Sequence, residues 1–172
     1  MKIFGTSKMI AYVSLLTASI ALATAWLKFP VLFGYVHLGD GLIFVAAMIL
    51  GPYSALPAAI GSAMADLFTG YTIYAPVTFL IKGVMGLTAG FVSQKFREIK
   101  HAYLVLTIVY ILCELWMVLG YLAYDWILYE EAAFGMIPFN LLQGLFGVII
   151  GLIFVKAFHR IRPLENLVQD KD

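Results

Sequence analysis

The chain of 172 residues has the length of a single domain, but 63% of its residues are hydrophobic and only 12% are charged. So few charges do not cover the surface of a water-soluble globule, which excludes that class and predicts one integral membrane domain spanning residues 1–172. The net charge of +1 gives no indication of a nucleic-acid partner, and the single Cys113 excludes an internal disulfide and a CxxC metal or redox motif.

Apolar segments predict six transmembrane helices. The first, residues 9–27, is longer than the hydrophobic core of a signal peptide, roughly 7 to 15 residues, and is close to the roughly 20 residues of a spanning helix. We therefore expect a retained helix, followed by an aromatic connection at residues 29–40 that is too irregular to be helical. The other helices are expected at residues 41–50, 53–68, 75–93, 102–122 and 137–158.

Residues 41–50 and 53–68 are unusual because each is short or interrupted. Gly51 and Pro52 predict a turn between them, and Pro57 lies within the second segment. Short or broken helices persist at membrane depth only where protein surrounds them or where they line a cavity. We expect both to lie inside the bundle.

The basic residues predict the orientation. With six spans both termini share one side, and only Lys28 falls on the other. The positive-inside rule then makes both termini cytoplasmic. It makes the connection at residues 29–40, the turn at Thr69 and an acidic loop at residues 124–135 external. The basic residues on the cytoplasmic side are Lys2, Lys8, Lys95, Arg97, Lys100, Lys156, Arg160, Arg162 and Lys171.

Small residues share one face of the first helix. They recur at spacings of three and four, and such faces let another helix approach closely in a bilayer. The face has two interpretations, packing within this protein or docking of a partner subunit. Its members are Ser14, Thr17, Ala18, Ala21 and Ala25.

Four ionisable residues, Asp40, Asp66, Lys82 and Glu114, lie within or beside the predicted spans. Charged groups at membrane depth usually face the protein interior or a cavity. At 1.5 Å per residue, Lys82 and Glu114 both fall roughly 10 to 12 Å below the outer surface. They are expected either to form a buried ion pair or to contact a bound solute.

Other polar side chains fall at the same depth, in stripes on three consecutive helices. Pockets for small ligands combine apolar and aromatic walls with a few placed polar groups, which these stripes would supply together. The stripes are Tyr74, Thr78 and Lys82; Glu114, Met117 and Tyr121; and Asn140 with Gln143.

Enzyme and metal chemistry find little support. His37 and Asp40 lack a third ligand, so no metal site is predicted. The sequence has no GxSxG, HExxH or GxxxxGK[ST] pattern, so energised transport would need a partner.

The order of these features resembles the substrate-binding S components of energy-coupling factor (ECF) vitamin transporters. The resemblance covers nearly the whole chain and is strongest at LGDGLIFVAAMILGP (38–52), IGSAMADLFTG (60–70) and FLIKGVMGLTAG (79–90). It implies an all-α bundle of six transmembrane helices with both termini cytoplasmic. It also implies a multi-pass protein of the cell membrane that binds a vitamin or precursor near the outer face.

The resemblance implies partners and a site. The chain would join a transmembrane coupling subunit and two cytoplasmic ATPases, which use ATP, while binding no cofactor itself. The family's AxxxA docking motif corresponds to Ser14 and Ala18, or to Ala21 and Ala25. Tyr35 and His37 would cap the ligand, and the residues lining it would be Thr78, Lys82, Glu114, Asn140 and Gln143.

The implied substrate is a small heteroaromatic vitamin or precursor of the hydroxymethylpyrimidine, pyridoxine or riboflavin type. The Met1-Lys2 start lacks the Met-His terminus of the nickel and cobalt members. Two alternatives remain: a structural or assembly membrane protein, whose outer polar stripes would pair and leave no cavity, and a membrane-embedded enzyme using Glu114 with His37 or Asp66.

Overall fold

The computed structural model describes residues 6–32, 35–96 and 102–169, with residues 158–169 described as backbone only. Several basic residues used above for orientation therefore lie outside the described residues or have undescribed side chains. Those residues are Lys2, Arg97, Lys100, Arg160, Arg162 and Lys171.

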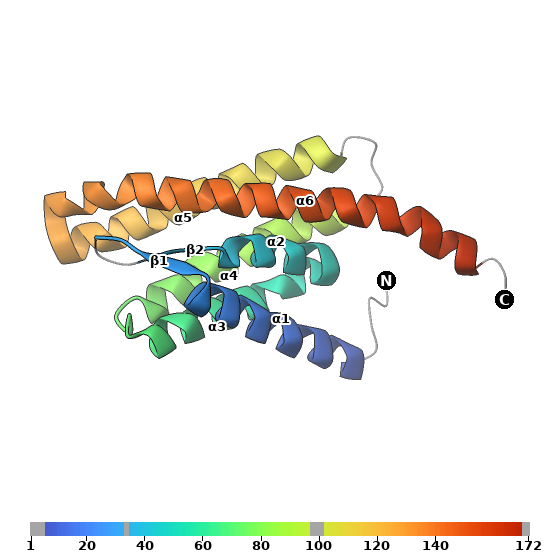
Figure 1. Cartoon of the computed structure of the whole chain (residues 1–172), viewed down its shortest axis with the longest axis horizontal. Coiled ribbons are helices and arrows are strands. Elements are labelled where there is room, and N and C mark those ends of the chain that lie inside the picture. The colour runs from blue at the N-terminus through green and yellow to red at the C-terminus, as the bar shows by residue number, and fades with distance from the viewer. Residues whose placement is uncertain (1–5, 33–34, 97–101, 170–172) are drawn as a thin grey trace.

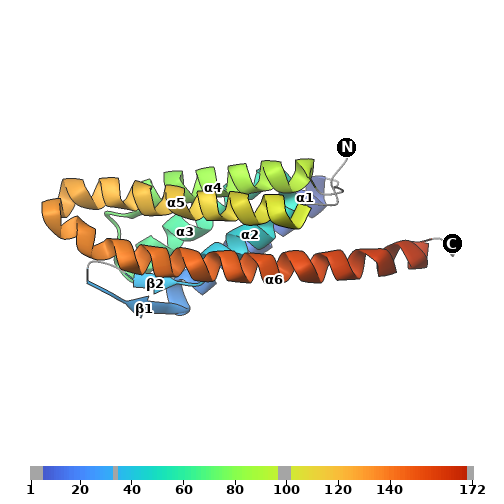
Figure 2. The ribbon, with the colours of Figure 1, turned by 90° about the horizontal axis from the view of Figure 1, so that it is seen from above.

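In the described part of the chain, six α-helices run back and forth along the long axis of the molecule (Figures 1 and 2). Helix α1 begins and helix α6 ends at the same end of the bundle (Figure 1). The all-helical prediction is confirmed. The helices are α1 (Thr6–Trp26), α2 (Gly39–Leu50), α3 (Ala55–Thr69), α4 (Ala75–Lys95), α5 (Ala102–Tyr129) and α6 (Ile137–Gln169).

A single 3-10 turn, η1 (Gly51–Ser54), reverses the chain between α2 and α3. Gly51 has a φ of 58°, a left-handed conformation that glycine adopts without a Cβ penalty. Pro57 lies in the first turn of α3, where its missing N–H removes no intrahelical hydrogen bond, so the helix continues through it.

The connection predicted to be non-helical forms no helix before Gly39 in its described residues, and it contains a small strand pair that was not predicted. Strand β1 (Lys28–Pro30) pairs antiparallel with β2 (Tyr35–His37), with Lys28 opposite His37. Aromatic residues and valine favour strands, and the pairing satisfies backbone groups that would otherwise be exposed. The strand pair fixes Tyr35 and His37 at the end of the bundle opposite the start of α1 (Figure 1).

The predicted acidic loop at residues 124–135 is also wrong in its bounds. Helix α5 continues to Tyr129, and the 3-10 segment η2 (Glu130–Met136) leads directly into α6. The charge of Asp125 suggested a solvated loop, but this residue is only 2% exposed and forms part of the helix.

The surface of the bundle is strongly apolar. Helix α5 alone exposes Leu104, Ile108, Leu112 and Leu119, each by half or more. Among the residues that the structure describes, four helical stretches are long and apolar enough to cross a membrane: Thr6–Trp26, Gly39–Thr69, Ala75–Lys95 and Ala102–Ala157. The second and fourth contain two α-helices each. A surface of this kind fits lipid rather than water.

The inner helices pack very closely where α4 passes η1. The Ser54 hydroxyl lies 2.7 Å from the carbonyl oxygens of Gly51 and Gly86. A Cβ at Gly90 would overlap the Gly51 carbonyl oxygen and lie 2.6 Å from the Ser54 hydroxyl. Glycine is therefore required at this crossing.

Candidate functional site

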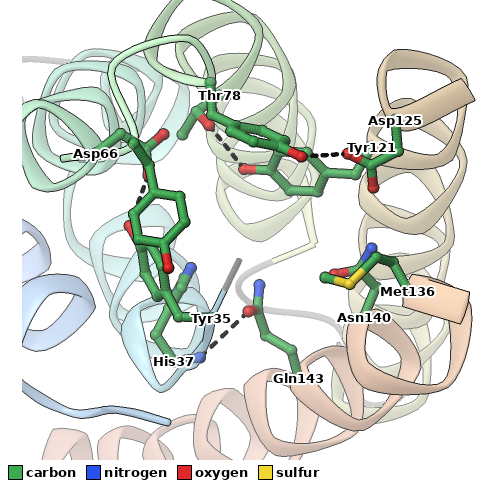
Figure 3. A pocket seen from close by; sticks show the side chains of 11 residues that line it. Tyr35, His37, Asp66, Thr78, Tyr121, Asp125, Met136, Asn140 and Gln143 are labelled. Atoms are coloured by element: carbon green, nitrogen blue, oxygen red, sulfur yellow. Dashed lines mark hydrogen bonds between the residues drawn. The ribbon is translucent and has the colours of Figure 1, made fainter. Parts of the chain in front are cut away.

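A pocket opens between β2, α3, α4, α5 and α6, toward the end of the bundle opposite the start of α1 (Figure 1), and Figure 3 shows the side chains that line it. Its volume is about 50 Å³. Pockets for small ligands are typically roughly 300 Å³ or more, so this pocket is small by comparison. The lining residues are Tyr35, His37, Asp66, Tyr71, Tyr74, Thr78, Tyr121, Asp125, Met136, Asn140 and Gln143.

Three hydrogen bonds tie the walls of the pocket together. The first runs from the Tyr35 hydroxyl to Asp66 Oδ1 at 2.6 Å, and joins β2 to α3 (Figure 3). The second runs from the Tyr74 hydroxyl to Asp125 Oδ1, also at 2.6 Å.

The third bond joins α4 to α5. The hydroxyls of Thr78 and Tyr121 lie 3.0 Å apart. Each bond therefore connects two different elements around the opening, so a ligand that enters between the walls meets groups already held in place.

Gln143 of α6 connects the pocket to the core. Its Oε1 accepts the His37 backbone N–H at 3.2 Å, and its Nε2 donates to Asp40 Oδ2 at 2.8 Å. Lys82 Nζ donates to Asp40 Oδ1 at 2.6 Å, and neither charged side chain of this pair is exposed. The floor of the pocket is thus a buried network from β2, α2, α4 and α6.

Of the two alternatives expected for Lys82 and Glu114, the ion pair between them is wrong. Lys82 pairs with Asp40 instead. Glu114 is 5% exposed, packs against Gly144 and Gly147, and has no hydrogen-bond partner for either carboxylate oxygen among the described residues. Equal depth along two helices does not fix the direction in which side chains point, and α5 turns Glu114 toward α6.

Of the nine residues predicted to bind substrate, seven line this pocket and two do not. Lys82 pairs with Asp40, with its Nζ 5.6 Å from the centre of the Tyr121 ring, and Glu114 of α5 is also outside the lining. The role of the seven in binding stays a prediction. They are Tyr35, His37, Tyr74, Thr78, Tyr121, Asn140 and Gln143.

Four lining residues, Asp66, Tyr71, Asp125 and Met136, were not predicted as site residues. Asp125 could have been predicted from the sequence, because it follows Tyr121 by four residues and residues at i and i+4 lie on the same face of a helix. Asp66 was recognised as an intramembrane charge, but only the turn at Gly70, with a φ of 87°, brings α3 beside the tyrosines.

Comparison with known families decides the class. The sequence model of a family described as "ECF-type riboflavin transporter, S component" matches residues 5–160. The chain belongs to this family. S components are transporter subunits rather than enzymes, so the expectation of a non-enzymatic protein is confirmed.

This S component is also similar to a protein of Pyrococcus woesei described as "uncharacterized protein in gap 3'region". The two are 32% identical over 120 residues, which cover 69% of this chain and 78% of the relative.

The small residues on one face of α1 differ in how far they are exposed in the S component. Ser14 and Ala18 are exposed, whereas Ala21 is buried at 7% and Ala25 is half-buried. On the inner side of the helix, α3 approaches so closely that a Cβ at Gly61 would lie 2.7 Å from the Thr17 carbonyl oxygen. Of the two predicted docking pairs, Ser14 with Ala18 is the one in which both residues are exposed.

His37 is held neutral in the S component. The Gly39 backbone N–H donates to His37 Nδ1 at 3.1 Å, so the ring proton is on Nε2. Burial lowers the pKa of His37 to about 4; the Asp40 carboxylate acts against this shift, and the Lys82 charge acts with it. A neutral imidazole with Nε2–H offers the pocket one hydrogen-bond donor.

Acidification is expected to destabilise the S component through His37. Between pH 6.5 and 4 the unfolded chain binds a proton at this residue and the folded chain does not, so the free energy of unfolding falls by roughly 3 kcal/mol as the pH drops. Thermal unfolding in a non-titrating detergent measures this. In His37→Gln the slope over that pH window should be smaller; parallel curves would contradict the assignment.

Proposed function

We propose that the chain is the substrate-binding subunit of an ECF-type importer that captures a small heteroaromatic vitamin or precursor at the outer face. The hydroxymethylpyrimidine, pyridoxine and riboflavin types are the candidates. The observation that carries the proposal is the pocket in which four tyrosines surround His37, Asn140 and Gln143. Aromatic faces bind a flat ring, and the polar groups orient it.

The proposed orientation is six spans with both termini cytoplasmic, in the cell membrane. The described basic residues at the end away from the pocket, Lys8, Lys95 and Lys156, support it. The pocket then faces outward, as capture of an external solute requires.

The proposed partners are a transmembrane coupling subunit and two cytoplasmic ATPases. Family membership supports association with such modules. The exposed Ser14 and Ala18 on α1 make this pair the better of the two docking registers, because Ala21 is occupied within the chain. ATP would be used by the partners, since the sequence has no phosphate-binding motif.

A structural role without a ligand is the second candidate. The bonds Tyr35 to Asp66, Tyr74 to Asp125 and Thr78 to Tyr121 favour it, because polar groups that pair with one another need no ligand. The experiment must therefore detect binding itself.

Native mass spectrometry of the protein from cells grown in rich medium is the test. We expect a stoichiometric vitamin-sized molecule. A panel of vitamins should also raise the melting temperature, because a ligand at 100 times its dissociation constant stabilises by about 2.7 kcal/mol. An empty protein with no shift across the panel would support the structural role.

Asn140→Ala should weaken binding of the identified ligand by about tenfold or more, the effect of one lost hydrogen bond. Isothermal titration measures this. Thr107→Ala is the matched control, because its hydroxyl bonds only the Tyr103 carbonyl on the exposed side of α5. Equal affinity in the wild type and in Asn140→Ala would remove Asn140 from the site.

A further inference from the structure

The charged residues that line the pocket are all acidic. Two carboxylates, Asp66 and Asp125, line it, and none of the eleven lining residues is lysine or arginine. The nearest buried cation, Lys82, is neutralised by Asp40. A ligand in this pocket therefore meets a negative potential in a site of low dielectric constant.

Asp66 has one carboxylate oxygen that can accept a further hydrogen bond. It is 5% exposed, and its Oδ1 accepts the Tyr35 hydroxyl. Its Oδ2 is buried and has no hydrogen-bond partner among the residues that the structure describes. A buried carboxylate oxygen without a partner is costly, and a donor from a bound ligand removes that cost.

Lys28 is the one described cation near the rim. Its Nζ lies 4.8 Å from the centre of the Tyr35 ring and 6.0 Å from that of Tyr71. Both rings are thereby shown to sit in positions that attract a positive charge. Lys28 is not part of the lining, so it does not neutralise Asp66 from within the pocket.

We propose that the ligand carries an amino-substituted nitrogen heterocycle whose amino group donates to Asp66 Oδ2, and that the pocket rejects anionic, phosphorylated forms of such rings. The inference rests on the proposed function and narrows its substrate class to aminopyrimidine-type rings. The tyrosine faces favour the electron-poor or protonated ring of this class. A phosphate group would face two carboxylates without a cation to pair with.

The test compares two probes that differ at one position, 4-amino-5-hydroxymethyl-2-methylpyrimidine and its 4-oxo analogue. The oxo group replaces a donor with an acceptor. In the wild-type protein in detergent we expect the amino probe to bind about 10 to 100 times more tightly, the range of a hydrogen bond to a charged group. The phosphate ester of the amino probe, phosphorylated on its 5-hydroxymethyl group, should show no binding at the same concentrations.

Asp66→Asn assigns the effect to this carboxylate. The amide oxygen still accepts the Tyr35 hydroxyl, and a melting curve of the empty variant checks its fold. We expect the preference for the amino probe to shrink at least tenfold. Glu131→Gln, which removes an exposed carboxylate at the same end, should keep the preference. Lys28→Met should not weaken the amino probe.

The outcomes separate this inference from the proposed function. Tight binding of riboflavin or the oxo analogue, unaffected by Asp66→Asn, would overturn the inference and leave the proposed function standing. Weaker ligand binding in Lys28→Met would point to an anionic ligand and also overturn it. Absence of binding by any vitamin in the panel would overturn both.

Discussion

Lys82→Met is expected to destabilise the protein by about 3 to 5 kcal/mol, the cost of leaving a buried charge without its partner. Lys82 is fully buried, and its Nζ is 2.6 Å from Asp40 Oδ1. Methionine keeps the volume of the stem but leaves Asp40 with only the Gln143 amide. Detergent-based thermal unfolding, or titration with a denaturing detergent, measures the loss.

The double variant Asp40→Asn with Lys82→Met separates charge from packing. Removing both charges deletes the unpaired group, so most of the lost stability should return, since neutral replacements of a buried pair often cost little. A single Lys82→Met variant as stable as the wild type, or a double variant no better than the single one, would show that the pair does not stabilise the bundle.

Gly90→Ala is expected to cost about 1 to 3 kcal/mol or more, because its methyl group would overlap the Gly51 carbonyl oxygen in the backbone of η1. A backbone carbonyl does not move aside as a flexible side chain does. To admit the methyl group, α4 and η1 must separate and weaken the Ser54 contacts with Gly51 and Gly86.

Gly83→Ala on the same helix is the matched control. A Cβ there would meet only the Ala59 Cβ, at 3.3 Å. Its effect should stay within about 1 kcal/mol, since alanine's higher helix propensity offsets the tight contact. Melting temperatures of the two variants in one detergent compare them directly. Equal losses would mean that the close approach at η1 is not what requires glycine.

Apolar segments, and the glycine and proline residues between them, predicted the helices of this chain, because a membrane helix needs an apolar segment and residues that end it. The turn at Gly51 and Pro52 was predicted for that reason and is present as η1. The strand pair β1 and β2 was not predicted, because three-residue strands have too few positions for a period of two to be recognised.

The candidate site was predictable in part because polar residues at one depth and on one helix face tend to meet. Tyr74, the N-cap residue of α4, is followed by Thr78 one turn later, and Asn140 and Gln143 lie near the start of α6. The partner of Lys82 was not predictable in this way. Choosing between Asp40 and Glu114 needs the rotation of each helix about its axis, which the packing of glycines such as Gly147 against Glu114 decides.

The buried pair also bears on how the chain is made. Asp40 and Lys82 are 42 residues apart, and Gln143 follows Asp40 by 103. At a synthesis rate of roughly 5 to 20 residues per second, Asp40 precedes its counter-charge by roughly 2 to 8 seconds. An unpaired carboxylate in hydrocarbon costs several kcal/mol, and α2 is too short to offset it. We therefore expect α2, α3 and α4 to enter the bilayer as one group, after α4 has emerged from the ribosome.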